Sequence, residues 1–184
     1  MTGGTEKQHG MNRSNPLLVV LALAAFVLIL LNLTGQLHLP HLPGGGPALA
    51  GHPRVVDGDT LDLAGTRIRL FGIDAPESAQ SCERDGAAYA CGQAAKHYLE
   101  QLIGGQPVSC RAKDHDRYGR EVAICTVGNA DINAAMVRAG WAVAYRQYST
   151  AYVPLEEEAR QSRAGLWAGH FEPPSSWRRE QHGF

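Results

Sequence analysis

The fold of this chain follows from residues 55–77, which read VVDGDTLDLAGTRIRLFGIDAPE. Apolar residues recur at alternate positions and an Ala-Gly pair divides the stretch, so we predict strands over 55–63 and 66–73 joined by a tight turn. A single strand over the first range would direct the carboxylates of Asp57 and Asp59 toward the core. Because ionised groups beside a core are costly unless they are paired or bind a metal, these carboxylates are candidate site residues.

Arginines lie close to these acidic residues. Arg69 belongs to the same stretch, and residues 116–120, DRYGR, contribute two more. Carboxylate oxygens are ligands that Ca²⁺ and Mg²⁺ prefer, and a guanidinium group can bind phosphate through two parallel hydrogen bonds. The combination predicts metal-assisted cleavage of a phosphodiester. An EF-hand loop is excluded, because counting from Asp57 places Asp62 where glycine is required and Ile68 where glutamate is required.

Four motifs, in their order and spacing, resemble the staphylococcal nuclease (thermonuclease) family. They are VVDGDTLDL (55–63), RIRLFGIDAPE (67–77), DRYGRE (116–121) and INAAMVRAGWAVAYRQY (132–148). The resemblance covers roughly residues 53–167 and implies an α+β fold, an OB-fold β-barrel of five strands with three helices. Strand patterns at 55–63, 66–73, 107–111, 122–127 and about 141–145, and helical patterns at about 92–103, 131–139 and 154–165, agree with it.

The resemblance implies a Ca²⁺ site. It assigns the metal to Asp59, Asp74 and the backbone carbonyl of Ala75, a position where the family prototype carries threonine. Because this ligand is a main-chain oxygen, the change to alanine is expected to cost little. Asp57 matches a nearby aspartate that we expect to orient the ligands without touching the ion. A plain Asp-Gly turn is the alternative for Asp57.

The resemblance also implies the catalytic groups. Glu77 matches a glutamate that activates or orients the attacking water, and Arg69 and Arg120 match the two arginines that hold the phosphate. Fixed guanidinium groups stabilise the negative charge that develops on the phosphate oxygens in the transition state. An ordinary surface salt bridge is the alternative for Glu77.

Aromatic residues are implied to bind the nucleotide. Tyr118 matches a tyrosine that helps to seat it, and Tyr145 and Tyr148 fall where the family stacks a base. The spacing leaves open which of the two stacks, and core packing is the alternative for both. Stacking accepts any base, so little sequence selectivity is expected.

The four cysteines all follow the apolar N-terminal segment and indicate an oxidising compartment. Three pairings are possible. Cys110 and Cys125 lie on apolar runs that could form an antiparallel pair, and Cys82 and Cys91 bracket the loop after Glu77, so we predict Cys82–Cys91 and Cys110–Cys125. A zinc site is disfavoured, because no two cysteines have the short Cys-x-x-Cys type of spacing.

The N-terminal region predicts a membrane segment. Residues 17–33 are apolar except Asn32 and would span about 26 Å as a helix, close to the ~30 Å hydrocarbon core. Lys7 and Arg13 precede the run, which places a cytoplasmic tail at 1–15 and the remainder outside the cytoplasm. We therefore predict a single-pass anchor at 16–35. Secretion after signal cleavage at Ala48-Leu49-Ala50 is the alternative.

The remaining organisation is a Pro/Gly/His linker at 36–52, a nuclease-like domain at 53–171 and a disordered tail at 172–184. From Arg54 onward there are 15 basic and 17 acidic residues, a difference of −2, which excludes a protein that coats nucleic acid by bulk charge.

The sequence thus predicts a Ca²⁺-dependent nuclease, cutting DNA and/or RNA, single-stranded for preference, without sequence selectivity. The resemblance implies 3′-phosphate products. A catalytically weak or inactive nucleic-acid-binding module on the same fold is the alternative. No protein partner is implied, and a monomer is expected.

Overall fold

The computed structural model describes residues 48–183, except the side chain of His182. The predicted cytoplasmic tail (1–15), the predicted anchor (16–35) and residues 36–47 of the predicted linker lie outside the described residues. Within 48–183, no helix is both long enough and apolar enough to cross a membrane.

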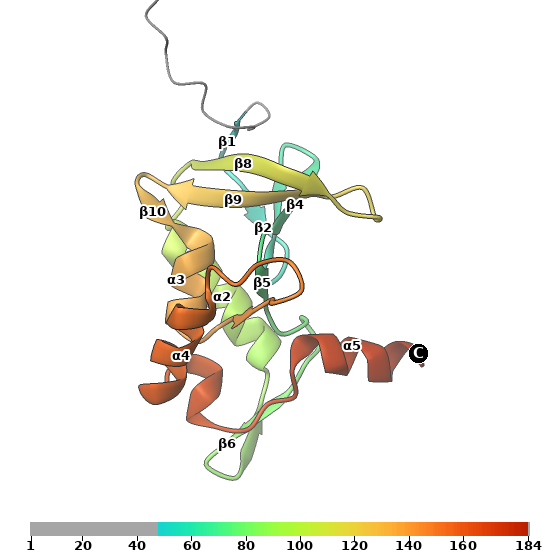
Figure 1. The fold of residues 1–184 in the computed structure, drawn as a ribbon, viewed down its shortest axis with the longest axis vertical. Helices are drawn as coiled ribbons and strands as arrows, with labels where there is room; N and C mark the ends of the chain where they lie inside the picture. The colour runs from blue at the N-terminus through green and yellow to red at the C-terminus, as the bar shows by residue number, and fades with distance from the viewer. Residues whose placement is uncertain (1–47, 184) are drawn as a thin grey trace, which may run out of the picture. The chain divides into compact units, whose positions relative to one another are not determined.

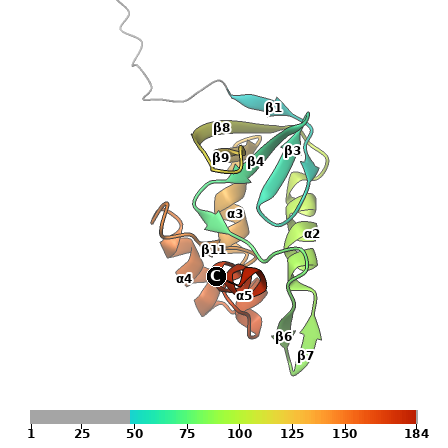
Figure 2. The ribbon, with the colours of Figure 1, turned by 90° about the vertical axis from the view of Figure 1, so that its right-hand side faces the viewer.

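Seven strands form one curled sheet, a half-barrel (Figure 1 and Figure 2). They are β1 (Leu49–Gly51), β2 (Arg54–Val55), β3 (Thr60–Leu63), β4 (Thr66–Leu70), β8 (Val108–His115), β9 (Glu121–Val127) and β10 (Ala130–Asp131). Along the sheet the order is β1-β8-β9-β4-β3-β2, with β10 beside β9. Only the β4–β9 pair is parallel among these neighbours. β1 extends the sheet into the segment that the sequence assigned to the linker.

Two smaller sheets complete the strands of the described part. β5 (Ile73–Asp74) pairs with β11 (Val143–Ala144), and β6 (Cys82–Arg84) pairs with β7 (Ala87–Tyr89). The predicted strand near 141–145 therefore lies outside the main sheet, and the five strands expected of the barrel are distributed over a seven-stranded curled sheet and the β5–β11 pair.

The predicted strand over 55–63 is interrupted. Between β2 and β3 the backbone turns, with Val56 N–H donating to the Thr60 carbonyl at 2.9 Å. The Asp57 carboxylate accepts the Asp59 N–H at 3.1 Å, so the side chain competes with the strand ladder for a backbone donor. By contrast, the predicted turn between β3 and β4 is confirmed, with positive φ at both Ala64 and Gly65 (52° and 88°), as a two-residue hairpin of type I′ requires.

The three predicted helices are present as α2 (Cys91–Ile103), α3 (Ile132–Arg138) and α4 (Val153–Gln161), followed by the 3-10 turn η1 (Gly165–Ala168). Asp131 caps α3 as predicted, its carboxylate accepting the Ala134 N–H at 2.9 Å. A fourth helix, α5 (Pro174–His182), occupies the segment predicted to be a disordered tail. Prolines at 173 and 174 explain its start, because proline is favoured in the first turn.

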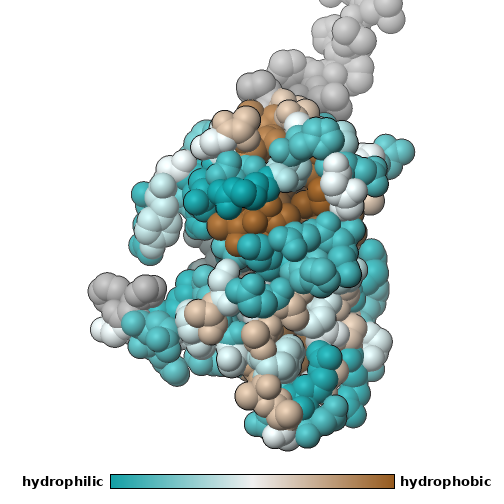
Figure 3. Space-filling model, turned by 180° about the vertical axis from the view of Figure 1, so that it is seen from behind, coloured by the Kyte–Doolittle hydropathy of each residue, from teal (hydrophilic) through white to brown (hydrophobic). Residues whose placement is uncertain are grey.

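The core lies between the curled sheet and helices α2 and α3. Leu61, Ile68 and Leu70 from the sheet pack with Leu99 of α2 and Met136 of α3, and all five side chains are buried. Figure 3 shows the opposite side from Figure 1, where an apolar band crosses the upper part of the domain and hydrophilic side chains surround it. Both predicted disulfides, Cys82–Cys91 and Cys110–Cys125, are confirmed. The second joins residues paired directly across β8 and β9.

Candidate active site

The residues of the site come from three neighbouring backbone segments. Asp59 directly precedes β3, and Arg69 lies opposite Thr60 in the β3–β4 pair. Asp74 ends β5, and Ala75 follows it. Leu70 N–H donates to the Asp59 carbonyl at 2.8 Å, which holds the start of β3 against the end of β4. The short strands therefore bring residues that are 15 positions apart in the chain, Asp59 and Asp74, into one cluster.

Arg69 bridges the two buried aspartates. One guanidinium nitrogen donates to Asp59 Oδ1, and the other donates to Asp74 Oδ1 at 2.6 Å. The aspartates are 2% and 1% exposed. Asp59 Oδ2 accepts the Ala75 N–H at 2.7 Å, and the Thr60 hydroxyl donates to Asp59 Oδ1 at 3.2 Å. Both carboxylates are therefore buried and share Arg69 as their cationic partner. The alternation of the sequence predicted the inward direction for Asp59.

Burial and the neighbouring carboxylates oppose the ionisation of Asp59. Burial raises the pKa of Asp59 to about 8 against the influence of Arg69, and the carboxylates of Asp57 and Asp74 raise it further. Although burial opposes the charge of Arg69, Asp59 and Asp74 raise the pKa of its guanidinium above the usual value. A further cation beside Asp59 and Asp74 would relieve the repulsion between their carboxylates.

A divalent metal fits this donor set in kind. The two carboxylates and the Ala75 carbonyl are the hard oxygen ligands that Ca²⁺ takes. Among residues 48–183 there is no group of three or more His, Cys, Asp or Glu side chains placed to hold a metal ion. Two carboxylates and one carbonyl are fewer oxygens than the six to eight that Ca²⁺ takes.

Glu77 joins the cluster through a residue that the sequence reasoning did not assign. Arg178 of α5 donates from Nη1 to Glu77 Oε1 at 2.8 Å and to Asp74 Oδ1 at 2.9 Å, and from Nη2 to Asp74 Oδ2 at 3.1 Å. Although partial burial opposes the charge of Arg178, Asp74 and Glu77 raise its pKa above the usual value. The two prolines followed by eight residues free of glycine and proline were the signal that a helix, and not a tail, carries this arginine.

Arg120 lies on the loop between β8 and β9. Its Nε donates to Asp116 Oδ2 at 2.6 Å, and Asp116 Oδ1 accepts the backbone N–H groups of Arg120 and Tyr118 at 3.0 and 2.9 Å. Although partial burial opposes the charge of Asp116, these donors hold its pKa below the usual value. Because β9 pairs with β4 and sets Val122 beside Arg69, the loop emerges near the acidic cluster. No hydrogen bond joins Arg120 to that cluster among the described residues.

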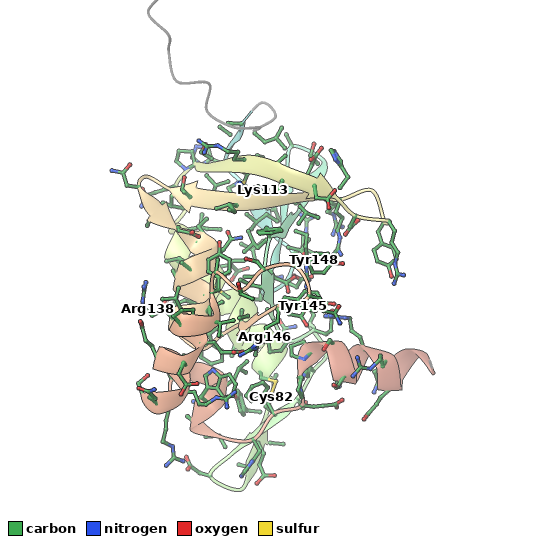
Figure 4. All side chains as sticks on the ribbon, in the orientation of Figure 1. Cys82, Lys113, Arg138, Tyr145, Arg146 and Tyr148 are labelled. Carbon is green, nitrogen blue, oxygen red and sulfur yellow. A yellow bond between two sulfur atoms is a disulfide. The ribbon has the colours of Figure 1, made fainter. Side chains whose placement is uncertain are left out.

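The tyrosines differ in exposure. Tyr118 is 69% exposed, and the guanidinium groups of Arg117 and Arg120 lie 4.9 and 5.7 Å from its ring centre. Tyr148 is 60% exposed, which rules out the core-packing alternative for it. Tyr145 is half-buried, and its ring centre lies 5.0 Å from that of Tyr148 (Figure 4). Both rings are therefore near the surface after β11.

Tyr145 also lines a cavity beside the acidic cluster. The cavity measures about 390 Å³, and its walls include Asp74, Trp167, Phe171 and Pro173. Tyr145 N–H donates to the Gly72 carbonyl at 2.9 Å, which ties the loop after β11 to the start of β5. The structure thus unites the predicted metal ligands with Arg69 and Glu77, sets Arg120 on an adjoining loop, and places Tyr145 with Asp74 in the wall of one cavity.

The chain is similar to known proteins over most of the described domain. A family model described as staphylococcal nuclease homologue matches residues 67–169. The succinoglycan biosynthesis protein ExoI of Rhizobium meliloti is 33% identical over 133 residues, covering 70% of this chain and 70% of the relative. An uncharacterized endonuclease of Haemophilus influenzae is 36% identical over 136 residues, covering 70% and 71%. The micrococcal nuclease of Shigella flexneri is 36% identical over 144 residues, covering 68% and 78%.

The matched residues 67–169 run from β4 through η1 and include Arg69, Asp74, Glu77 and Arg120. They make up more than half of the chain, and the relatives are covered over at least 70% of their own length. The chain therefore belongs to the staphylococcal nuclease family.

Proposed function

We propose that this protein is a nuclease that hydrolyses phosphodiester bonds of DNA and/or RNA in the presence of Ca²⁺. It acts without sequence selectivity, prefers single strands and leaves 3′-phosphate ends. The observation that carries the proposal is the cluster of two buried aspartates and Glu77 around arginines at the ends of short strands. Its family relatives include proteins named endonuclease and micrococcal nuclease.

The chain's own residues divide the work. Asp59, Asp74 and the Ala75 carbonyl would hold Ca²⁺, which supplies a positive charge that draws a phosphate oxygen into the site and offsets the charge formed during attack. Glu77 takes a proton from the attacking water or orients it. Arg69 and Arg120 offer guanidinium groups to the phosphate oxygens, and Asp57 fixes the backbone of Asp59 through its N–H.

The exposed tyrosines suit a substrate that is not base-paired. Tyr118 and Tyr148 are open to solvent, so unstacked bases can lie on them, at about 1–3 kcal/mol for each stacked base. The base then stacks either on Tyr148 alone or on both Tyr145 and Tyr148, because Tyr145 is half-buried. Any base offers a π-face, which supports cleavage without sequence selectivity.

We also assign the action of the enzyme to the outside of the cytoplasm, with residues 16–35 as a single-pass anchor. The positive residues Lys7 and Arg13 before the apolar run and the two disulfides support this placement.

The proposal is tested with the purified full-length protein and fluorescent single-stranded DNA and RNA. We expect cleavage with Ca²⁺ and none with chelator, and 3′-phosphate ends that block extension until a phosphatase removes them. Glu77→Gln should lower kcat by about 10²–10⁴-fold, the usual contribution of a general base. Asp59→Asn keeps an acceptor for the Ala75 N–H. It should raise the Ca²⁺ concentration needed for half-maximal activity and also lower the cleavage rate.

Glu157→Gln is the matched control, because Glu157 is exposed on α4 and its side chain bonds only to Gln161. It should cleave as fast as the unmodified protein. Full activity of both Glu77→Gln and Asp59→Asn would refute the site. Binding of DNA in chelator, with no cleavage under any metal, would instead establish the alternative of a binding module on this fold.

A further inference from the structure

Arg178 contacts two carboxylates of the acidic cluster. Its guanidinium forms a bidentate pair with Asp74 and a third hydrogen bond with Glu77, at 2.8–3.1 Å. Its side chain is 28% exposed. The residue comes from the C-terminal helix α5, 104 positions beyond Asp74 in the chain. A helix from the end of the chain thus places a cation on a proposed metal ligand and on the proposed general base.

All four carboxylate oxygens of Asp59 and Asp74 accept hydrogen bonds. Asp59 Oδ1 accepts from Arg69 and Thr60, and Asp59 Oδ2 accepts from Ala75. Asp74 Oδ1 accepts from Arg69 and Arg178, and Asp74 Oδ2 accepts from Arg178. Each terminal nitrogen of Arg69 likewise uses one of its two N–H groups on an aspartate. A cation that binds Asp74 must therefore take oxygen positions that Arg178 holds, and like charges at one carboxylate repel.

Apart from Arg178, α5 makes few polar contacts, and its packing is confined to its first turns, where Pro174 is buried and Trp177 is half-buried. Among the described residues, no other α5 side chain forms a hydrogen bond or ion pair with residues 48–169, and the guanidinium of Arg179 reaches only Ser176 of the same helix. Figure 1 shows α5 running outward, apart from α2, α3 and α4. The segment before it is held by backbone contacts, where the Gln80 amide donates to the Glu172 carbonyl at 2.7 Å and Glu83 pairs with His170.

We propose that α5 is an autoinhibitory helix, in which Arg178 competes with the divalent cation for Asp74 and Glu77. The inference rests on the proposed function of this cluster. In the closed state Arg178 neutralises the carboxylates; binding of a cation and of a phosphate releases the helix about its fixed start at 170–173. Release also opens the cavity beside Asp74, because Ser175 of α5 forms part of its wall. The free energy of cation binding therefore includes the cost of breaking the Arg178 contacts.

Two measurements on the full-length protein test this: the Ca²⁺ dissociation constant by calorimetry, and hydrogen exchange of the α5 amides with and without Ca²⁺. Arg178→Ala should bind Ca²⁺ about tenfold more tightly than the unmodified protein, equivalent to ~1.4 kcal/mol. Its α5 amides should exchange fast without Ca²⁺. In the unmodified protein, saturating Ca²⁺ should accelerate exchange of the same amides. Arg179→Ala removes an equal charge from the same helix and should behave as the unmodified protein does.

Each outcome of these measurements either supports or overturns the autoinhibitory helix. Equal Ca²⁺ affinity in the unmodified protein and Arg178→Ala, or slower α5 exchange with Ca²⁺, overturns the autoinhibitory helix while leaving the nuclease assignment intact. Weaker Ca²⁺ binding by Arg178→Ala also overturns it, since Arg178 would then be supporting the site. Absence of Ca²⁺ binding in all three proteins removes both this inference and the calcium requirement of the proposed function. Arg178→Lys keeps the charge without the bidentate geometry and should bind Ca²⁺ with intermediate affinity.

Discussion

Asn133 of α3 is fully buried, yet its amide is completely used. Its Oδ1 accepts the Cys125 N–H at 3.1 Å, and its Nδ2 donates to the carbonyls of Phe71 and Ala123 at 2.9 and 3.2 Å. One side chain therefore joins α3 to β9 and to the end of β4. An isolated Asn in an otherwise apolar helical pattern gives no sign of this role, because its partners are backbone groups of distant strands.

Substitution of this residue tests how much the link contributes. Asn133→Ala should lower the free energy of unfolding by about 2–4 kcal/mol, because the buried Cys125 N–H loses its acceptor and the Phe71 carbonyl loses a donor, at roughly 1–3 kcal/mol each, while the Ala123 carbonyl still accepts the Phe71 N–H. Denaturant unfolding followed by tryptophan fluorescence measures the change. Asn129→Ala, at an exposed position, should stay within about 0.5 kcal/mol of the unmodified protein. Equal midpoints for both variants would show that the Asn133 hydrogen bonds do not stabilise the fold.

Much of the site at this scale was accessible from the sequence. Asp59 could be predicted because a buried charge in an alternating strand needs a partner, and the structure supplies Arg69, which the family resemblance had implied as a site residue. Arg178 could not be predicted in this way. Its partners lie 101 and 104 residues away, and nothing in a short polar C-terminal segment specifies where it folds back.

The start of α2 touches the active site through its backbone. Gly92 packs so closely that a Cβ built there would lie 1.8 Å from the Glu77 carbonyl oxygen. The Cys82–Cys91 disulfide holds the same helix end from the other side. The helix end thus sets the position of the loop that carries Glu77.

Gly92→Ala should therefore act opposite to the usual helix rule. Glycine to alanine in a helix normally stabilises by about 1 kcal/mol. Here we expect a loss of about 1–3 kcal/mol from overpacking, measured by denaturant unfolding. Because displacement of a catalytic group by about 1 Å can cost ~10²-fold, kcat should fall as well. Glu100→Ala, on the exposed face of α2, is the control and should change neither quantity. A gain in stability in Gly92→Ala would contradict the close approach.

Element types were easier to predict than element boundaries. Alternation and helical periodicity located α2, α3, β4 and β9, and the Ala-Gly turn set one register. They failed at Asp57 and Asp59, because a side-chain hydrogen bond to the backbone ends β2 without disturbing the apolar alternation. They also failed for α5, which has no apolar stripe to signal it.

For the molecule as a whole, charge is local. The chain has a formal net charge of −1, and the cations near the acidic cluster are few, so phosphate contacts are limited to a small number of arginines. With two or three such contacts, the logarithm of single-strand affinity should fall against the logarithm of salt with a slope of about −1.4 to −2.1. Fluorescence anisotropy of a labelled oligonucleotide across a salt series measures it, using Glu77→Gln so that the substrate survives.

Arg120→Ala should reduce that slope by about 0.7, the value for one phosphate contact on a single strand. Arg138→Ala is a matched control, since Arg138 lies at the end of α3 and pairs with Glu158. A slope near −5 would indicate a broad basic surface, contrary to the balance of charge in the sequence.

The connection between Asp74 and Arg178 has a consequence for biosynthesis. The chain is made from its N-terminus, so Asp59, Arg69 and Asp74 emerge together, whereas Arg178 emerges 104 residues after Asp74. At about 5–20 residues per second, ribosomes need roughly 5–20 s to make that interval. During those seconds the nascent acidic cluster has only one of its two arginines, so ions in the surrounding solution can reach it before the last helix exists.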